Sequence, residues 1–314
     1  MSQENKQALD LIPDFLIIGA GKSGTTSVDN YLKQHPEIYI SPKKEPNFFG
    51  YELNTAADFE GSPEIKHYQN SVTNIDAYLE LFRGAKEGQQ KGETSNTYMY
   101  HDLAAERIKH YNPEVRLIAI LRQPAERLYS RYLHLAREDR LPTERFEDCL
   151  NSNTIWWRRN DLVKEGFYGK HLTKFYQLFQ RDQLKVILFD ELKAKPEEVL
   201  KDIFKFIGVD NDIDIDFSVE YNKSGFIKNK KVDALIGQNS RPKELIKKLM
   251  PKSLFDKIKN QQFVQKKLND VRGKNLERPK LSDQLKAELT QEIYAQDINL
   301  LGSLIQRDLS HWLK

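Results

Sequence analysis

Short apolar runs alternate with amphipathic stretches along the first two thirds of the chain. The runs have the length and β-branched content of buried strands, and the amphipathic stretches have helical periodicity. The predicted strands are residues 14–19, 115–121 and 184–189. The predicted helices are residues 25–34, a long helix from Pro124 to about Glu138, and a helix after residue 189 that Pro196 interrupts. This alternation predicts a parallel sheet with helical crossovers.

The end of the chain has a different pattern. Residues 282–313 carry apolar side chains at a spacing close to 3.6, which predicts one or two helices packed on the core with a structural role. These apolar residues are Leu285, Leu289, Ile293, Leu300, Leu304 and Ile305. No repeat or low-complexity linker divides the sequence, so we expect one large α/β domain, a parallel sheet flanked by helices.

Composition supports a folded domain. The 314 residues are 39% hydrophobic and 11% aromatic, enough for a sizeable core, which excludes global disorder. The formal net charge of +3 is too small to make the whole chain a nucleic-acid binder. Residues 226–274, however, hold fourteen Lys or Arg against four Asp or Glu. This region predicts either a local anion site or two solvated, lysine-faced helices.

The remaining features of the sequence bear on the cellular compartment of the protein. The single cysteine, Cys149, excludes an internal disulfide and a cysteine-rich zinc or iron–sulfur site. No apolar run approaches the ~18 residues of a membrane span. The first residues have neither the basic start nor the apolar core of a signal peptide. We therefore expect a cytoplasmic protein without a membrane span.

Residues 13–27, PDFLIIGAGKSGTTS, are the most informative segment. An apolar strand leads into a glycine-rich turn and then into a helix. Backbone N–H groups and the positive end of a helix converge at such a turn. The segment therefore predicts a site for a phosphate group.

Two general nucleotide motifs compete for this turn. Gly19, Gly21 and Gly24 match the dinucleotide fingerprint, which needs an acidic ribose partner ~20 residues later at the end of a second strand. Glu37 and Glu45 have roughly this spacing, but both flank prolines in a stretch without a clear strand pattern. The fingerprint alone is weak evidence for a nicotinamide-dependent oxidoreductase.

The nucleotide P-loop motif fits less well. Lys22 and Ser23 match its end, but its first glycine would fall at Leu16. A Mg²⁺-dependent enzyme also needs an Asp at the end of a strand, where this chain has Arg122. A P-loop kinase is therefore a weaker alternative, and a catalytically idle nucleotide-binding module also stays open.

Several segments together resemble one enzyme family. Residues 22–26 (KSGTT), followed by 32–36 (LKQHP) and 44–49 (KEPNFF), resemble the 5′-phosphosulfate loop region of sulfotransferases that use 3′-phosphoadenosine 5′-phosphosulfate (PAPS). Residues 121–132 resemble the 3′-phosphate motif of the same family. Further similarity lies in residues 92–98, 166–172 and 308–312. The resemblance covers nearly the whole chain, and the most similar types are bacterial and heparan sulfotransferases.

The resemblance implies a P-loop-like fold with three parts. Residues 13–225 would form the nucleotide-binding core, 226–280 a basic helical insertion and loop, and 281–314 the C-terminal helices. PAPS would be the donor and 3′,5′-adenosine diphosphate (PAP) the product. Sulfuryl transfer moves a charged group in line between two oxygens, so positioning and charge stabilisation matter most and no metal is needed.

The resemblance assigns the 5′-phosphate to the turn after the first strand. Its backbone amides and hydroxyl groups would hold this phosphate, and Lys22 would reach the oxygen that bridges phosphate and sulfate. The residues of this predicted site are Gly21, Lys22, Ser23, Gly24, Thr25 and Thr26.

The 3′-phosphate is assigned to Arg122 and Ser130, which are eight residues apart. The guanidinium fork of Arg122 suits a phosphate dianion, and Ser130 returns to the same helix face after about two turns. The alternative for Arg122 is an internal ion pair with Glu126. A basic turn that would close over the 3′-phosphate, or else is a plain exposed turn, consists of Arg272, Gly273 and Lys274.

The acceptor must lose a proton as the new bond forms. Glu45 occupies the position of the catalytic carboxylate in heparan-type relatives, with Lys43 or Lys44 beside it to keep it ionised. The alternatives are a glutamate that pins the loop, or a histidine base at His67 or His101.

Three further residues are expected near the ligands. Glu93 and His67 are expected to face the acceptor. Tyr168 either stacks near the adenine or belongs to the core. Thr94 stands where a relative often has lysine, which disfavours a polyanionic acceptor. We expect a hydroxyl acceptor on a carbohydrate, a lipid or a carrier-bound acyl chain, and no nucleic acid.

Overall fold

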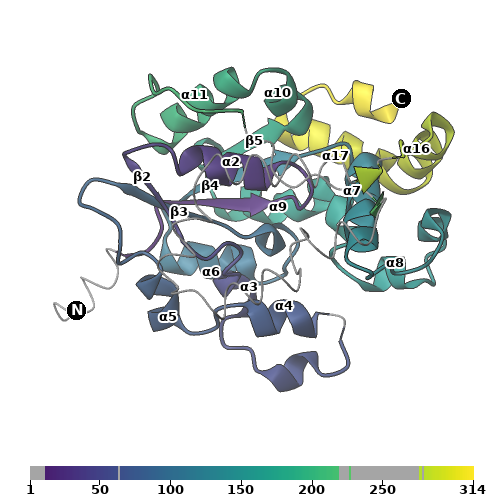
Figure 1. Cartoon of the computed structure of the whole chain (residues 1–314), viewed down its shortest axis with the longest axis horizontal. Coiled ribbons are helices and arrows are strands. Elements are labelled where there is room, and N and C mark those ends of the chain that lie inside the picture. The colour runs from purple at the N-terminus through teal and green to yellow at the C-terminus, as the bar shows by residue number, and fades with distance from the viewer. Residues whose placement is uncertain (1–10, 63, 219–225, 228–275, 278) are drawn as a thin grey trace.

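A five-stranded parallel sheet forms the centre of the fold (Figure 1). The computed structural model describes residues 11–62, 64–218, 226–227, 276–277 and 279–314. The strand order is β2-β3-β1-β4-β5, and β6 and β7 form a separate antiparallel ribbon. The strands are β1 Phe15–Gly19, β2 Ile38–Ile40, β3 Gln90–Thr94, β4 Arg116–Leu121, β5 Leu184–Leu188, β6 Phe226–Ile227 and β7 Leu276–Glu277.

Helices cover both faces of the sheet. The α-helices are α2 Thr25–Leu32, α3 Phe48–Tyr51, α4 Ile65–Asn70, α5 Ile75–Glu80, α6 Ala104–Tyr111, α7 Pro124–Arg137, α8 Ile155–Arg158, α9 Tyr168–Leu178, α10 Phe189–Ala194, α11 Pro196–Ile207, α16 Asp283–Leu289 and α17 Ala295–Ile305. The 3₁₀ turns are η1 Ala56–Phe59, η2 Asn96–Met99, η3 Phe146–Leu150, η4 Lys164–Gly166, η5 Arg181–Gln183 and η7 Ser310–Leu313. One π-helical turn, η6 Thr290–Tyr294, joins α16 to α17.

The alternation of side chains along β1 explains the layers. Leu16 and Ile18 pack with α6, α7, α9 and α17 on one face of the sheet. Phe15 and Ile17 pack with α2 and α11 on the other face. Since both faces are buried, the strand is apolar at every position, as is usual for parallel sheets.

The local sequence fixes where the helices beside the site begin. Gly24 has φ 94° at the N-cap of α2, a conformation that favours glycine, and a Cβ there would lie 3.1 Å from a methyl group of Leu192. On α7, Pro124 is the first residue, and the Gln123 side chain accepts a hydrogen bond from Glu126 N. Both helices therefore begin at the carboxyl edge of the sheet.

The structure confirms most of the predicted elements. The three predicted strands and the helices after them are present, and α10 ends just before Pro196, where α11 begins. The C-terminal pattern forms α16 and α17, and α17 packs against α9. A short strand, β2, lies in the stretch that lacks a clear strand pattern. In the described part of the chain, no helix is long and apolar enough to span a membrane.

Candidate functional site

One large cavity lies at the carboxyl edge of the sheet. Its volume is about 1060 Å³, and segments that follow all five strands line it. Ligands of open α/β sheets bind at this edge. The predicted site residues that line it are Gly21, Lys22, Gly24, Thr25, Thr26, Glu45, His67, Arg122 and Ser130. The fold thus brings together segments that are more than a hundred residues apart in the sequence.

The turn between β1 and α2 presents backbone donors to this cavity. Among the described residues, the N–H groups of Lys22, Gly24 and Thr25 have no hydrogen-bond acceptor. Lys22 has φ 68°, a left-handed conformation that is uncommon for a residue with a side chain and often marks functional sites. Open N–H groups at the start of a helix form an anion site.

Two members of the turn differ from expectation. The Gly21 N–H already donates to Glu165 Oε1 at 2.6 Å, so it is not open to a phosphate. The Ser23 side chain is fully buried beside the Tyr168 phenol and does not line the cavity. The expected phosphate contacts therefore belong to the rest of the turn.

The cavity wall around Lys22 is strongly basic. Burial, together with the nearby Arg131 and Arg137, lowers the pKa of Lys22 to about 7. Burial also lowers the pKa of Lys44, whose ammonium donates a hydrogen bond to Thr26 Oγ1. Cations that repel one another in a buried wall are stabilised by a bound anion.

The segment from the end of β4 into α7 carries the second predicted phosphate site. Arg122 directly follows β4, and its guanidinium lies 5.0 Å from the centre of the Phe189 ring. Its Nη2 lies 3.1 Å from Glu126 Oε2, so the ion pair considered as the alternative for Arg122 is present. Ser130 lines the cavity two turns further along the helix. Arg122 therefore combines a cavity position with an internal partner.

Glu45 lies in a turn held against the end of β3. Its N–H donates to Thr94 O at 2.9 Å, and Asn96 Nδ2 donates to Glu45 Oε1 at 2.9 Å. The side chain is half-buried, lines the cavity and lies near Lys44, where its charge opposes the lowering of the Lys44 pKa. A carboxylate in this place can accept a proton from a ligand in the cavity.

The predicted histidines differ in whether they line the cavity. His67 lines the cavity, and burial lowers its pKa. His101 lies outside the cavity wall, packs against Tyr51 with ring centres 5.5 Å apart, and has a pKa lowered to about 4 by burial. His35 is buried against Phe204, just after the first helix. Only His67 of the predicted rivals is therefore placed to act as a base.

Two predicted ligand contacts lie in the core instead. Tyr168 is 0% exposed and packs near Trp312, so the core alternative describes it better than a stack on adenine. Glu93 is also 0% exposed and is held by the hydroxyls of Tyr78 and Ser95 at 3.2 and 2.8 Å. Burial raises the pKa of Glu93 to about 7. Neither side chain lines the cavity, because each is covered by its neighbours.

The predicted basic turn is not placed. Arg272, Gly273 and Lys274 lie outside the described residues, as does most of the basic stretch at 226–274.

The sequence reasoning missed several cavity residues. His134 lines the cavity, and burial together with Lys22 lowers its pKa to about 2. Glu126, Ser130 and His134 are spaced by four along α7 and continue the same spacing from Arg122, which lies just before the helix. This spacing places side chains on one helix face, so the sequence could have identified His134. Other polar and charged cavity residues that the prediction missed include Asn96, Arg131, Asp161, Glu165 and Lys286.

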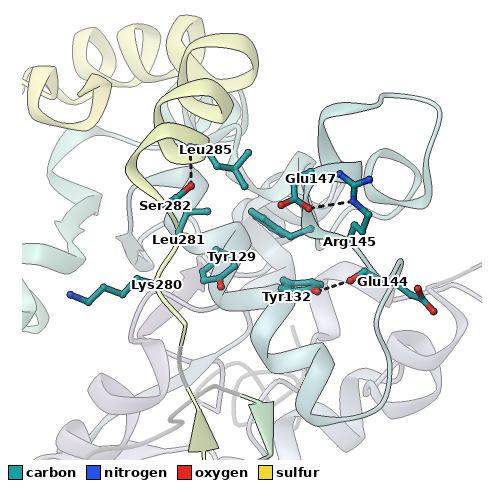
Figure 2. A pocket seen from close by; sticks show the side chains of 10 residues that line it. Tyr129, Tyr132, Glu144, Arg145, Glu147, Lys280, Leu281, Ser282 and Leu285 are labelled. Atoms are coloured by element: carbon teal, nitrogen blue, oxygen red, sulfur yellow. Dashed lines mark hydrogen bonds and ion pairs between the residues drawn. The ribbon is translucent and has the colours of Figure 1, made fainter.

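A smaller cavity of about 380 Å³ adjoins the large one (Figure 2). Tyr129, Lys280 and Leu281 line both cavities. Figure 2 shows the Tyr129 and Tyr132 rings together with Leu281 and Leu285 around the space.

Among the described residues, no group of three or more His, Cys, Asp or Glu is arranged to hold a metal ion.

Comparison with known proteins agrees with this geometry. The family model described as "Sulfotransferase domain" matches residues 12–295. The bifunctional heparan sulfate N-deacetylase/N-sulfotransferase 1 of Caenorhabditis elegans is 30% identical over 201 residues, which are 62% of this chain and 22% of that protein. The Homo sapiens protein of the same name is 26% identical over 233 residues, 70% of this chain and 25% of that one. The chain thus spans about a quarter of the length of these relatives.

A solved structure is similar over the whole domain. The crystal structure of a sulfotransferase from Alicyclobacillus acidocaldarius has a TM-score of 0.69 and 28% sequence identity. The match covers 96% of this chain and 99% of that one.

Proposed function

This chain belongs to the sulfotransferase domain family, and we propose that it transfers a sulfuryl group from PAPS to an acceptor hydroxyl by in-line transfer without a metal. One observation carries this proposal. The amide-rich turn at Lys22, the pair Arg122 and Ser130, and the carboxylate of Glu45 line one cavity at the carboxyl edge of the sheet. A donor with phosphates at its 5′ and 3′ positions needs two such anion sites.

The cavity residues have different proposed roles in binding the donor and in the reaction. The N–H groups of Lys22, Gly24 and Thr25 and the side chains of Thr25 and Thr26 would hold the 5′-phosphate. Lys22 would stabilise the negative charge that grows on the leaving oxygen as the O–S bond breaks. Arg122 and Ser130 would bind the 3′-phosphate.

Glu45 completes the chemistry as general base. The acceptor oxygen forms its bond to sulfur while Glu45 takes the proton that this oxygen loses. Asn96 donates to Glu45 Oε1 at 2.9 Å, which orients the carboxylate. His67 lies on the same cavity wall and is the rival base.

The topology disfavours the nicotinamide alternative. In the dinucleotide fold, the strand after the first helix lies beside the first strand and ends in the acidic ribose partner. Here β2 lies at the sheet edge, with β3 between it and β1, and it ends at Ile40 before Ser41. The P-loop kinase alternative still lacks the first glycine and the strand-end Asp.

A second acceptor class is an amine. The names of the curated relatives include N-sulfotransferase, although this chain matches only about a quarter of those proteins. A screen with ³⁵S-labelled PAPS against hydroxyl and amine acceptors, each tested at matched concentration, separates the two classes.

Calorimetry tests the donor. Without Mg²⁺, we expect the affinity for PAP to be ~10-fold to 100-fold higher than the affinity for 5′-ADP or NAD. Neither 5′-ADP nor NAD has a 3′-phosphate, so neither can make the charged hydrogen bonds to this group. Equal affinity for PAP and 5′-ADP would contradict the assignment of Arg122 and Ser130. A protein that binds PAP but shows no turnover with any acceptor would be an idle binding module.

A further inference from the structure

The two proposed phosphate sites lie on different elements. The 5′ site is the turn between β1 and α2, and the 3′ site consists of Arg122, directly after β4, and Ser130 on α7. A ligand that carries both phosphates must engage both sites at once. Its affinity therefore depends on the distance between the turn and the helix, whereas the affinity of a monophosphate does not.

A buried carboxylate connects the turn to the helix. Glu165 belongs to the 3₁₀ turn η4 and is 3% exposed. Its Oε1 accepts from Gly21 N at 2.6 Å, and its Oε2 accepts from Arg127 Nη1 at 2.8 Å. Gly21 belongs to the turn that carries the proposed 5′ site, and Arg127 lies on α7, one turn before Ser130. The Glu165 side chain is thus hydrogen-bonded both to the turn that carries the 5′ site and to the helix that carries Ser130 of the 3′ site.

The Arg127 end of this connection is held from several sides. The Arg127 side chain is 0% exposed, and it also donates to the backbone carbonyls of Asp161 and Leu162. A buried guanidinium with a carboxylate partner and two carbonyl acceptors has little freedom to move. Its position fixes the position of the Glu165 carboxylate.

Gly21, at the other end of this connection, lies in direct contact with the Glu165 carboxylate. A Cβ at Gly21 would lie 2.9 Å from Glu165 Oε1, so the turn and the carboxylate are in direct contact. Gly21 N–H is the first donor of the turn, and it is used for this contact rather than for a ligand. The arrangement leaves the N–H groups of Lys22, Gly24 and Thr25, which line the cavity, for a ligand.

We infer that Glu165 is a positioning residue that, through Arg127 and Gly21, sets the spacing between the 5′-phosphosulfate turn and the 3′-phosphate helix. The inference rests on the proposed function, since it assumes one ligand with both phosphates. In the proposed reaction Glu165 does not contact the reacting atoms. It affects the affinity for a donor that must bind both phosphate sites at once.

Binding of three nucleotides to Glu165→Gln tests the inference. The variant keeps a carbonyl oxygen for Gly21 N but places an uncharged amide beside Arg127. We expect the affinity for PAP to fall by ~10-fold to 100-fold, and the affinities for 5′-AMP and 3′-AMP to change by less than ~3-fold, because only PAP uses both sites together.

Two further variants keep the test decisive. Arg127→Met combined with Glu165→Leu removes the connection without leaving a buried charge, and it should show the same selective loss. Asp297→Asn is the matched control, since the Asp297 carboxylate also accepts from backbone N–H groups, of Gly169 and Lys170 at 2.8 Å, but does not line the cavity. This control should keep PAP affinity within ~3-fold.

The outcomes separate the inference from the proposed function. A wild-type protein that does not prefer PAP over 5′-AMP would overturn the proposed function. If the wild type prefers PAP and the folded Glu165 variants keep that preference, only the role of Glu165 is wrong. Equal losses for PAP and both monophosphates would also overturn it, because they would show damage to the sites themselves rather than to their spacing.

Discussion

Arg122 Nη2 lies 3.1 Å from Glu126 Oε2, one helical turn away on α7. The other carboxylate oxygen of Glu126 lies 3.3 Å from Lys286 Nζ. Two cations that line the cavity are therefore partly neutralised by one glutamate. A phosphate that binds Arg122 must compete with Glu126 for the guanidinium.

The competition predicts opposite effects for the two partners. Arg122→Ala should weaken PAP binding by ~10-fold to 100-fold, the value of one or two charged hydrogen bonds. Glu126→Gln should leave PAP affinity unchanged or raise it by up to ~10-fold, because the competing charge is gone. Calorimetry with PAP measures both, and 5′-AMP, which lacks the 3′-phosphate, should bind equally to all three proteins. A large loss of PAP affinity in Glu126→Gln would show instead that Glu126 positions Arg122.

Lys22 is predicted to act on turnover rather than on product binding. Lys22→Ala should lower turnover by ~10² to 10³, the usual loss when one donor to a developing negative charge is removed, with a smaller change in PAP affinity. Lys33→Ala is a suitable control, because Lys33 pairs with Asp29 at 2.6 Å and does not line the cavity. Near-normal turnover in Lys22→Ala would make Lys22 a structural residue of the turn.

The low pKa of Lys22 predicts proton uptake on donor binding. In the free protein this pKa is about 7, because burial and the nearby Arg131 disfavour the ammonium form. A bound phosphate favours the ammonium form and raises the pKa, so at pH 8 PAP binding should take up about one proton. PAP affinity should fall as pH rises above 7, by at most ~10-fold per unit.

Calorimetry at pH 8 in buffers of different ionisation enthalpy measures this uptake. Phosphate groups are already ionised at this pH, since their second pKa is ~6. His134, with a pKa of about 2, stays neutral. In Lys22→Met the uptake should vanish. Uptake that persists in this variant would assign the proton to another group.

The sequence predicts the central sheet well because its strands are mostly apolar and buried. β1 is apolar throughout, and β4 and β5 each contain one basic residue, Arg116 and Lys185. The glycines and Pro124 mark the helices that follow β1 and β4. The outer strand β2 has three residues, too few for a period-two pattern. β3 begins with the polar residues Gln90 and Lys91, so its first half has the composition of a loop.

The candidate site is predicted less completely, for a physical reason. Motifs identify residues such as Lys22 and Arg122, but not which side of an element they face. Ser23 and Glu93 belong to matching motifs, yet packing turns both side chains into the core. Glu165 carries no motif signal, because its role depends on a hydrogen bond to Gly21, 144 residues earlier in the chain.

Glu93 predicts a pH dependence of stability. Its pKa is about 7 in the folded protein, raised by burial, against ~4.3 for an ordinary glutamate. The folded state therefore binds more protons than the unfolded state between these values, and stability falls as pH rises through this window. The contribution of Glu93 to the free energy of unfolding should be on the order of 1–3 kcal/mol smaller at pH 8 than at pH 5.

Urea unfolding of wild type and Glu93→Gln at both pH values measures this difference. The neutral side chain of the variant keeps an oxygen for the Tyr78 hydroxyl but cannot ionise, so its stability should depend less on pH. An unchanged pH dependence in Glu93→Gln would show that Glu93 titrates near its ordinary value.

The contact between Asn96 and Glu45 leads to the prediction for the general base. Asn96 Nδ2 donates to Oε1, which leaves Oε2 for the acceptor proton. Glu45→Gln should lower turnover by ~10² to 10⁴, the usual contribution of a general base, while PAP affinity stays nearly the same. Asn96→Ala should cause a smaller loss of turnover, because the carboxylate remains but is no longer oriented.

Glu64→Gln is the matched control for this test. Glu64 is also a half-buried carboxylate bonded by an asparagine, Asn160, but it does not line the cavity, so its loss should leave turnover within ~3-fold. Melting curves must show that Glu45→Gln is folded, because an unfolded variant would mean that Glu45 pins its loop. A folded, active Glu45→Gln together with an inactive, folded His67→Gln would assign the base to His67. In that case the acid limb of the kcat/KM profile would persist in Glu45→Gln, whereas a carboxylate base at Glu45 predicts that this limb disappears in Glu45→Gln.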